Sequence, residues 1–283
     1  MIENQADGRG VQSIEVGVRI LEALALASKP LKLKDVAEAA NVAPAQAHAY
    51  LMSFRRHAMV EQDAATGLYR LGHFALQLAI ARMRSFDPLR RAGEVALDLA
   101  AQTRLTTALS VWGSFGATVI YIHEGADQIH INTRAGTVYS LTGTATGLVF
   151  AAHLHEHQVR AEIEAEAAEP GSTRRVGLRL AFADIADSLP RIRKQGYATI
   201  DPPPVPEIRA IASPVFDHLG QILMVVTLIG PGGVLDDRPP GRHVEEVLRA
   251  ARGLSDQMGY VAPRADAAPP VKAKARLRAP ATA

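Results

Sequence analysis

The most constraining feature of this sequence is the order of patterns in its first 72 residues. Three segments with apolar residues at helical spacing begin near Ser13, Leu33 and Pro44. Two short alternating segments follow, separated by a turn that ends in Thr66-Gly67. The two central helices are too short to form a domain alone, but the first helix and the hairpin can cover them. This order predicts a winged helix-turn-helix.

The third segment, VAPAQAHAYLMSFRRHAMV, lies where such a fold has its recognition helix. Pro44 can open this helix because the first helical position needs no N–H donor. Ala47, Leu51 and Phe54 recur at helical spacing and form its predicted buried stripe. The remaining positions face outward or lie at the flanks.

Several outward positions suit DNA. Glutamine can bond both edge atoms of adenine, alanine can touch a thymine methyl, histidine can reach a phosphate or guanine, and arginines further along the helix suit the backbone. Alternation along the second hairpin strand adds one more exposed arginine. The candidate DNA-binding residues are therefore Ala45, Gln46, His48, Ala49, Arg55, Arg56 and Arg70.

Charge gives this assignment modest support. Between Pro44 and Arg84, five arginines stand against Glu61 and Asp63, a local charge of +3 that predicts salt-sensitive binding. The whole chain carries only +2, so its overall charge identifies no partner. Two alternatives stay open: the helix is a packing element of a domain that no longer binds DNA, or Arg70 is simply a solvated strand residue.

The rest of the chain divides by pattern. Asp87-Pro88 is a helix start, with Asp as N-cap and Pro at the first position. Gly-separated β-branched runs alternate with helical segments beyond it, which predicts an α+β domain with helices on one side of a mainly antiparallel sheet, similar to GAF and PAS sensor domains. The predicted parts are a winged helix-turn-helix at 11–72 (helix-turn-helix about 33–52, wing about 59–71), a linker helix at 73–86, the α+β domain at 87–262 and a disordered basic tail at 263–283.

Several classes of function are disfavoured. The chain has no cysteine, which excludes disulfides and thiolate metal sites. It has no GxSxG, GxGxxG or Walker A pattern, so we expect neither enzymatic activity nor a cofactor. The start lacks a signal peptide, and the apolar run at 222–230 is too short to span a membrane, which predicts a cytoplasmic protein. His153 and His157 have a spacing that could chelate zinc on a helix, but no third ligand is evident, so an exposed helix end is the better interpretation.

The arrangement resembles the IclR family of bacterial transcriptional regulators from about Val11 to Ala262. The resemblance is carried by the order of VQSIEVGVRILEAL, LKLKDVAEAANV, GLYRLG, IRKQGYATID, IASPVFD and LIGP. It implies a homodimer or homotetramer that binds a palindromic double-stranded operator and a small effector in the C-terminal domain. The recognition helix departs from the family, which usually has Ser or Thr near its start and an Arg one turn on.

The resemblance also implies where the effector binds, namely between the sheet and the start of the TGTATG helix, whose free N–H groups attract anions. Ala210 and Ile229 make this pocket less polar than in some family members, which favours an organic acid with apolar or aromatic bulk. Trp112 and Tyr121, on the first predicted strands of this domain, could form a wall of the pocket or could equally belong to the hydrophobic core. The candidate effector-binding residues are Trp112, Tyr121, Gly143, Thr144, Ala145, Thr146, Asp201, Ala210 and Thr227. The alternative function is a small-molecule sensor or oligomeric scaffold whose DNA-binding head has decayed.

Overall fold

The computed structural model describes residues 10–27, 29–126, 133–168, 175–201, 203–239 and 241–262. The chain divides into two compact units between Phe86 and Asp87, and each unit is described separately. The basic stretch at 263–283, which the sequence predicts to be disordered, lies outside the described residues.

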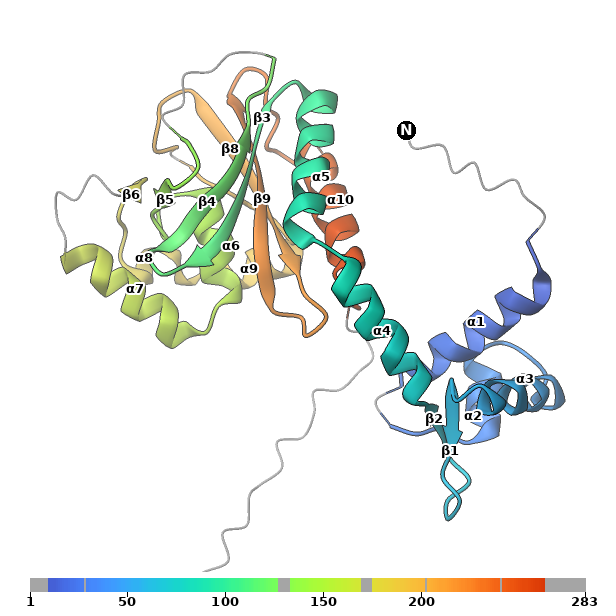
Figure 1. The fold of residues 1–283 in the computed structure, drawn as a ribbon. Coiled ribbons are helices and arrows are strands. Elements are labelled where there is room, and N and C mark those ends of the chain that lie inside the picture. The colour runs from blue at the N-terminus through green and yellow to red at the C-terminus, as the bar shows by residue number, and fades with distance from the viewer. Residues whose placement is uncertain are drawn as a thin grey trace, which may run out of the picture. The chain divides into compact units, whose positions relative to one another are not determined.

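The first unit is a helix-turn-helix followed by a hairpin and a helix (Figure 1). Pro44 occupies the first turn of α3, as its sequence position predicts. The hairpin strands pair antiparallel, with Val60 opposite Leu71. The elements are α1 (Gln12–Ala25), α2 (Leu33–Ala39), α3 (Pro44–Arg56), β1 (Val60–Gln62), β2 (Tyr69–Leu71) and α4 (His73–Ser85).

The core of this unit forms where the three helices and the second wing strand meet. Ala47 and Leu51 of α3 are fully buried, and Phe54 is partly buried beside them. In α1 the buried apolar residues are Val16, Ile20 and Leu24, whereas Ile14 and Val18 are exposed. The sequence offers two apolar faces on this helix, and only contact with α2, α3 and β2 selects one.

Helix α4 contributes no buried residue to the unit. It is nevertheless rich in apolar side chains, and Leu76, Ile80 and Met83 recur along it at spacings of four and three while remaining exposed. A helix with such a row needs a surface to cover it.

In the second unit, the described residues form one seven-stranded sheet. Its strands are β3 (Thr106–Gly113), β4 (Gly116–His123), β5 (Val138–Tyr139), β6 (Arg175–Val176), β7 (Ala198–Thr199), β8 (Ile208–Phe216) and β9 (Ile222–Pro231). Its helices are α5 (Pro88–Thr103), α6 (Ala145–His153), α7 (Glu156–Ala168), α8 (Phe182–Ala186), α9 (Ser188–Gln195) and α10 (Arg242–Gln257). Asp87 caps α5, its side chain accepting from the N–H groups of Leu89 and Arg90.

The strand order is β6-β5-β4-β3-β9-β8-β7. All neighbours pair antiparallel except β5 and β6, which are parallel, so the sheet is mixed. Helices α5 and α10 pack on one face, and α6 with α7, α8 and α9 packs on the other (Figure 1). The expectation of helices on one side was therefore wrong, because the strands of this sheet bury apolar side chains on both faces.

Two hydrophobic cores follow from this layering. Phe150, Val225 and Ile192 belong to the core on the α6 face, and Leu109, Leu228 and Leu254 belong to the core on the α5 and α10 face. Helix α6 is central to the first core, since Ala145 to Ala152 are all buried. Within the described residues, no helix combines the length and apolar character needed to cross a membrane.

Candidate functional site

A cavity lies in the second unit at the N-terminal end of α6. It is small, with a volume of about 60 Å³, and it is partly open to solvent. Its wall combines hydroxyl side chains with a larger apolar surface, and no charged side chain of the described residues lines it. The lining residues are Thr133, Tyr139, Thr144, Ala145, Thr146, Val176, Ile200, Pro204, Val205, Ile208, Ala210, Thr227 and Ile229.

The first turn of α6 forms the polar end of this cavity. Thr144 is the N-cap, and its Oγ1 accepts from the N–H of Gly147 at 2.9 Å. The N–H groups of Ala145 and Thr146 have no acceptor among the described residues. Helix N-termini carry partial positive charge, so two free donors here suit an anion.

Two pairs of hydroxyl groups add further polarity. Thr146 Oγ1 and Thr227 Oγ1 are 2.7 Å apart, and both side chains are about 1% exposed. One of these hydroxyls donates to the other, which leaves one proton without an acceptor in the pair. The hydroxyl of Tyr139 donates to Thr133 at 3.2 Å, and burial raises the pKa of Tyr139, so its phenol stays protonated.

The structure brings Thr144, Ala145, Thr146, Ala210 and Thr227 together around the cavity, and it places the other predicted effector residues elsewhere. Trp112 packs on Phe150 in the core, with ring centroids 5.6 Å apart. Asp201 is turned to the surface, where Arg209 Nη1 bonds its Oδ1 at 3.2 Å.

Tyr121 lies on the opposite face of the sheet, near Gly93 of α5. A β-bulge explains this position. Leu109 pairs with Tyr121 while Ser110 pairs with Val119, so Ile120 is an extra residue that reverses the alternation along β4.

Gly143 has a different use from the one expected. A Cβ at this position would lie 1.9 Å from the carbonyl oxygen of Leu178. Glycine therefore permits a close backbone crossing between residues 143 and 178, which form an isolated bridge.

Sequence reasoning missed much of the cavity wall. Thr133, Tyr139 and Val176 come from segments with short or weak strand patterns, and Ile200 and Ile208 read as ordinary strand residues. The proline-rich stretch at 202–206 is a better signal, because proline restricts the backbone of a loop, and Pro204 and Val205 do line the cavity.

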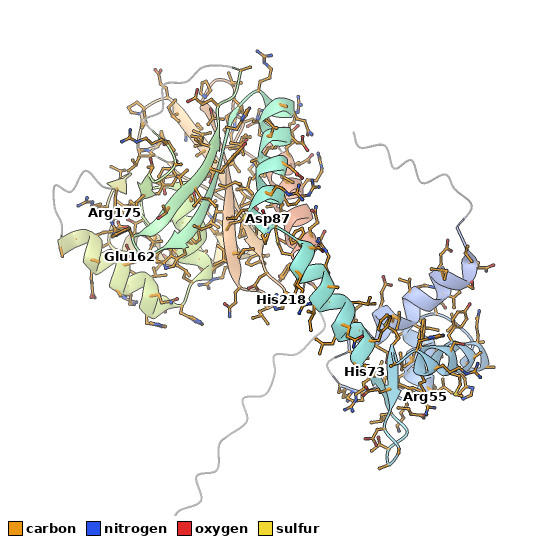
Figure 2. The ribbon with its side chains drawn as sticks, viewed as in Figure 1. Arg55, His73, Asp87, Glu162, Arg175 and His218 are labelled. Atoms are coloured by element: carbon orange, nitrogen blue, oxygen red, sulfur yellow. The ribbon has the colours of Figure 1, made fainter. Side chains whose placement is uncertain are left out.

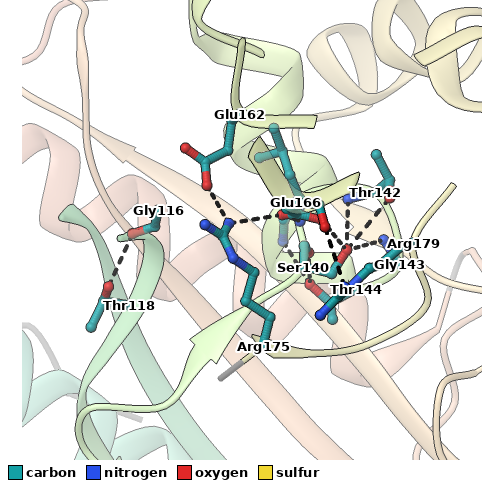
Figure 3. Close-up of polar contacts among 12 residues, drawn as sticks. Gly116, Thr118, Ser140, Thr142, Gly143, Thr144, Glu162, Glu166, Arg175 and Arg179 are labelled. Atoms are coloured by element: carbon teal, nitrogen blue, oxygen red, sulfur yellow. Dashed lines mark hydrogen bonds and ion pairs between the residues drawn. The ribbon is translucent and has the colours of Figure 1, made fainter. Parts of the chain in front are cut away.

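A polar network supports the segment before α6, residues 140–144 (Figure 3). Ser140 Oγ contacts the carbonyl of Leu178 at 2.7 Å and the carboxylate of Glu166 at 3.0 Å. Arg175 pairs with Glu166 at 3.2 Å and also with Glu162. Although burial lowers its pKa, the paired carboxylates outweigh this and raise the pKa of Arg175, which stays charged.

In the first unit, every candidate DNA-binding residue is exposed. Arg55 Nη1 donates to Gln62 Oε1 at 2.9 Å, and Gln62 Nε2 donates to the carbonyl of Gly67 at 3.0 Å. These two hydrogen bonds link α3 to both ends of the wing turn (Arg55 is labelled in Figure 2). Arg70 pairs with Glu61 across the hairpin at 3.3 Å, whereas Arg56 has no acidic partner among the described residues.

The two histidines considered for a metal do not share a helix. His153 ends α6 and His157 lies in α7, because the backbone at Leu154 turns to an extended conformation. The i, i+4 alternative on a single helix does not hold, and the favoured interpretation of an exposed end holds for His157 but is wrong for His153, which is partly buried. His157 instead stacks on His155.

Comparisons with known proteins agree with this architecture. Residues 13–64 match the IclR helix-turn-helix domain, and residues 82–256 match the bacterial transcriptional regulator IclR C-terminal domain. The Escherichia coli HTH-type transcriptional regulator XynR is 25% identical over 89% of this chain and 99% of its own length. The Paracoccus denitrificans HTH-type transcriptional regulator BhcR is 27% identical over 92% of this chain and 91% of its own.

A solved structure gives the same result. The crystal structure of Pseudomonas aeruginosa HmgR is 34% identical to this chain, covers 88% of it and 99% of HmgR, and superposes with a TM-score of 0.74. The relatives are transcriptional regulators rather than enzymes. The chain belongs to the IclR family of bacterial transcriptional regulators.

Proposed function

We propose that this regulator binds a palindromic operator through α3 and the wing, and that a small organic acid in the α6 cavity controls this binding. The observation that carries the effector assignment is the pair of free N–H groups at Ala145 and Thr146, which face a cavity whose walls are otherwise largely apolar. A carboxylate suits the helix terminus, and an apolar or aromatic body suits the walls.

Magnitudes indicate that both parts of the ligand matter. A helix N-terminus in a partly buried site stabilises an anion by up to about 2 kcal/mol. Burying roughly 100 Å² of apolar ligand surface contributes about 2.5 kcal/mol at about 25 cal/mol per Å². Because no Arg or Lys lines the described cavity, a small acid with little apolar surface lacks the partners that would hold it tightly.

A calorimetric titration tests the effector assignment. We expect benzoate or phenylacetate to bind, and benzamide, which matches benzoate in shape but carries no charge, to bind at least tenfold more weakly. Tight binding of a two- or three-carbon keto acid, with millimolar or weaker affinity for the aromatic acids, would contradict the proposal.

The DNA-binding part of the proposal is supported by the exposed face of α3. Ala43 provides no side-chain cap, so the N–H groups of Ala45 and Gln46 remain available to a phosphate. Gln46 is exposed near the same end, where recognition helices contact bases. We expect it to dominate sequence preference in place of the hydroxyl residues and Arg typical of the family.

A gel shift with the intergenic DNA upstream of the chain's own gene tests this half. Gln46→Ala should weaken specific binding by about 1–3 kcal/mol while leaving binding to unrelated DNA unchanged. If the wild-type protein fails to bind at low salt, the alternative of a sensor or scaffold with a decayed head is correct instead.

We further propose that the regulator is a homodimer or homotetramer, as a palindromic operator requires. The exposed row of Leu76, Ile80 and Met83 on α4 supports self-association. Light scattering should report a smaller species for Leu76→Asp than for the control Gln77→Asp on the same helix. Equal masses for the two variants would show that this row of α4 does not form the interface.

A further inference from the structure

A buried carboxylate lies behind the cavity wall without lining it. Glu166 of α7 is 3% exposed, and its carboxylate accepts from Leu141 N at 2.9 Å, Ser140 Oγ at 3.0 Å and Arg175 Nη1 at 3.2 Å. A charged group excluded from water is tolerated only when such partners are present. Figure 3 shows Glu166 between Arg175 and the 140–144 segment.

The contacts continue from Glu166 to the first turn of α6. Ser140 and Leu141 are held by the carboxylate, and the carbonyl of Ser140 accepts from Thr144 Oγ1 at 2.9 Å. That same Oγ1 accepts from the N–H of Gly147, which fixes the start of the helix. Glu166 is thus connected to the helix terminus through three successive hydrogen bonds.

The carboxylate also decides which amides are free. It takes the N–H of Leu141, while Ser140 Oγ lies 3.3 Å from the N–H of Gly143. Within the part of the chain that the structure describes, the N–H groups of Ala145 and Thr146 at the cavity remain without an acceptor.

We propose that Glu166, neutralised by Arg175, is a positioning residue for the effector site. It fixes the 140–144 segment and so directs the free N–H groups of Ala145 and Thr146 into the cavity. The use of those groups to bind an acid rests on the proposed function, but their positioning can be measured without any ligand.

Amide hydrogen exchange of the ligand-free protein tests the positioning. Glu166→Ala should raise exchange at Leu141, Gly147 and Leu148 at least tenfold, while the strands β8 and β9 keep their protection. Glu166→Gln should behave almost as wild type, because its oxygen still accepts from Leu141 and its amide can donate to Ser140. The matched control is Glu164→Ala, an exposed acid on the same helix.

Unchanged exchange at residues 141–148 in Glu166→Ala, or a uniform rise that includes β8 and β9, would overturn the proposal. If Glu166→Ala does not fold, Ser140→Ala removes one of the three donors and is judged by the same criteria.

Titration with benzoate then links positioning to binding. Benzoate affinity should fall at least tenfold in Glu166→Ala and be restored in Glu166→Gln, with benzamide affinity changed much less. Equal benzoate affinity in wild type and Glu166→Ala would overturn the link. Absence of benzoate binding to the wild type would count against the proposed effector class alone, and the exchange result would still decide the role of Glu166.

Discussion

Arg55 of the recognition helix donates a hydrogen bond of 2.9 Å to Gln62 in the first wing strand. Gln62 in turn donates to Gly67 at the far end of the wing turn. The neutral side chain of Gln62 thus connects α3 to the wing turn, in addition to the backbone hydrogen bonds at the end of the helix.

Gln62→Ala should weaken operator binding about three- to tenfold without changing its dependence on salt, because the substitution loosens the wing but removes no charge. Fluorescence anisotropy over a series of KCl concentrations measures both quantities. Gln77→Ala on α4 is the matched control. Affinity equal to wild type would mean that the Arg55–Gln62–Gly67 connection does not contribute to binding.

Arg56→Ala should have the complementary effect. Arg56 is exposed and has no acidic partner among the described residues, so its charge is available to a phosphate. Its loss should weaken binding to all sequences alike and reduce the slope of log affinity against log salt by about one. A sequence-dependent loss with an unchanged slope would assign Arg56 to base contact instead.

Substitutions in the hydroxyl pair of Thr146 and Thr227 should affect protein stability and ligand affinity differently. Thr146→Val alone leaves the buried Thr227 hydroxyl without its partner and should lower the free energy of unfolding by about 1–3 kcal/mol. The double variant with Thr227→Val removes both hydroxyls and should regain most of that loss. Urea unfolding measures both changes.

Acid affinity should fall in the double variant even though its stability recovers, because the spare hydroxyl proton is gone. Calorimetry with benzoate makes the comparison. Wild-type affinity in the double variant would show that neither hydroxyl contacts the ligand.

His153 should make the second unit sensitive to mild acid. Burial, with a smaller contribution from the Arg193 guanidinium, lowers the pKa of His153 from 6.5 to about 4, and its Nε2 has no hydrogen-bond partner within the described part of the chain. Between these values the unfolded chain binds a proton that the folded chain does not, so the free energy of unfolding decreases as the pH falls from 6.5 towards 4.

His153→Phe should flatten this dependence, since phenylalanine does not titrate and can pack on Phe216 as the imidazole does. Urea unfolding between about pH 7.5 and about pH 5 measures the slope, which a single histidine can change by at most about one proton. A slope equal to that of wild type would exclude His153 as its source.

Local signals in the sequence predicted many of the elements correctly. Pro44 and the Asp87-Pro88 pair mark helix starts, because the preference for these residues depends only on the first turn of the helix itself. The position of Tyr121 could not be predicted in this way. Its face is set by one extra residue in β4, and that bulge depends on pairing with β3.

The polar contacts of Glu166 behind the cavity could not be predicted from the sequence either. Glu162 and Glu166 are four residues apart on a helix, and such a pair usually marks a solvated surface. Only the approach of Arg175 and the 140–144 segment makes Glu166 a buried group. Family resemblance led to the α6 terminus, but the residues that position it come from a segment without any recognisable motif.

Helix α6 is buried on every side, so the two parts of the cavity wall should differ in how well they tolerate substitutions. Substitutions at Thr144 to Thr146 disturb a tightly packed helix, whereas Val205 is 43% exposed and Ile208 and Ala210 are only partly buried. A biosensor library that seeks a new effector should therefore vary the outer wall and keep the helix terminus, so that selectivity changes while the proposed carboxylate-binding site is retained.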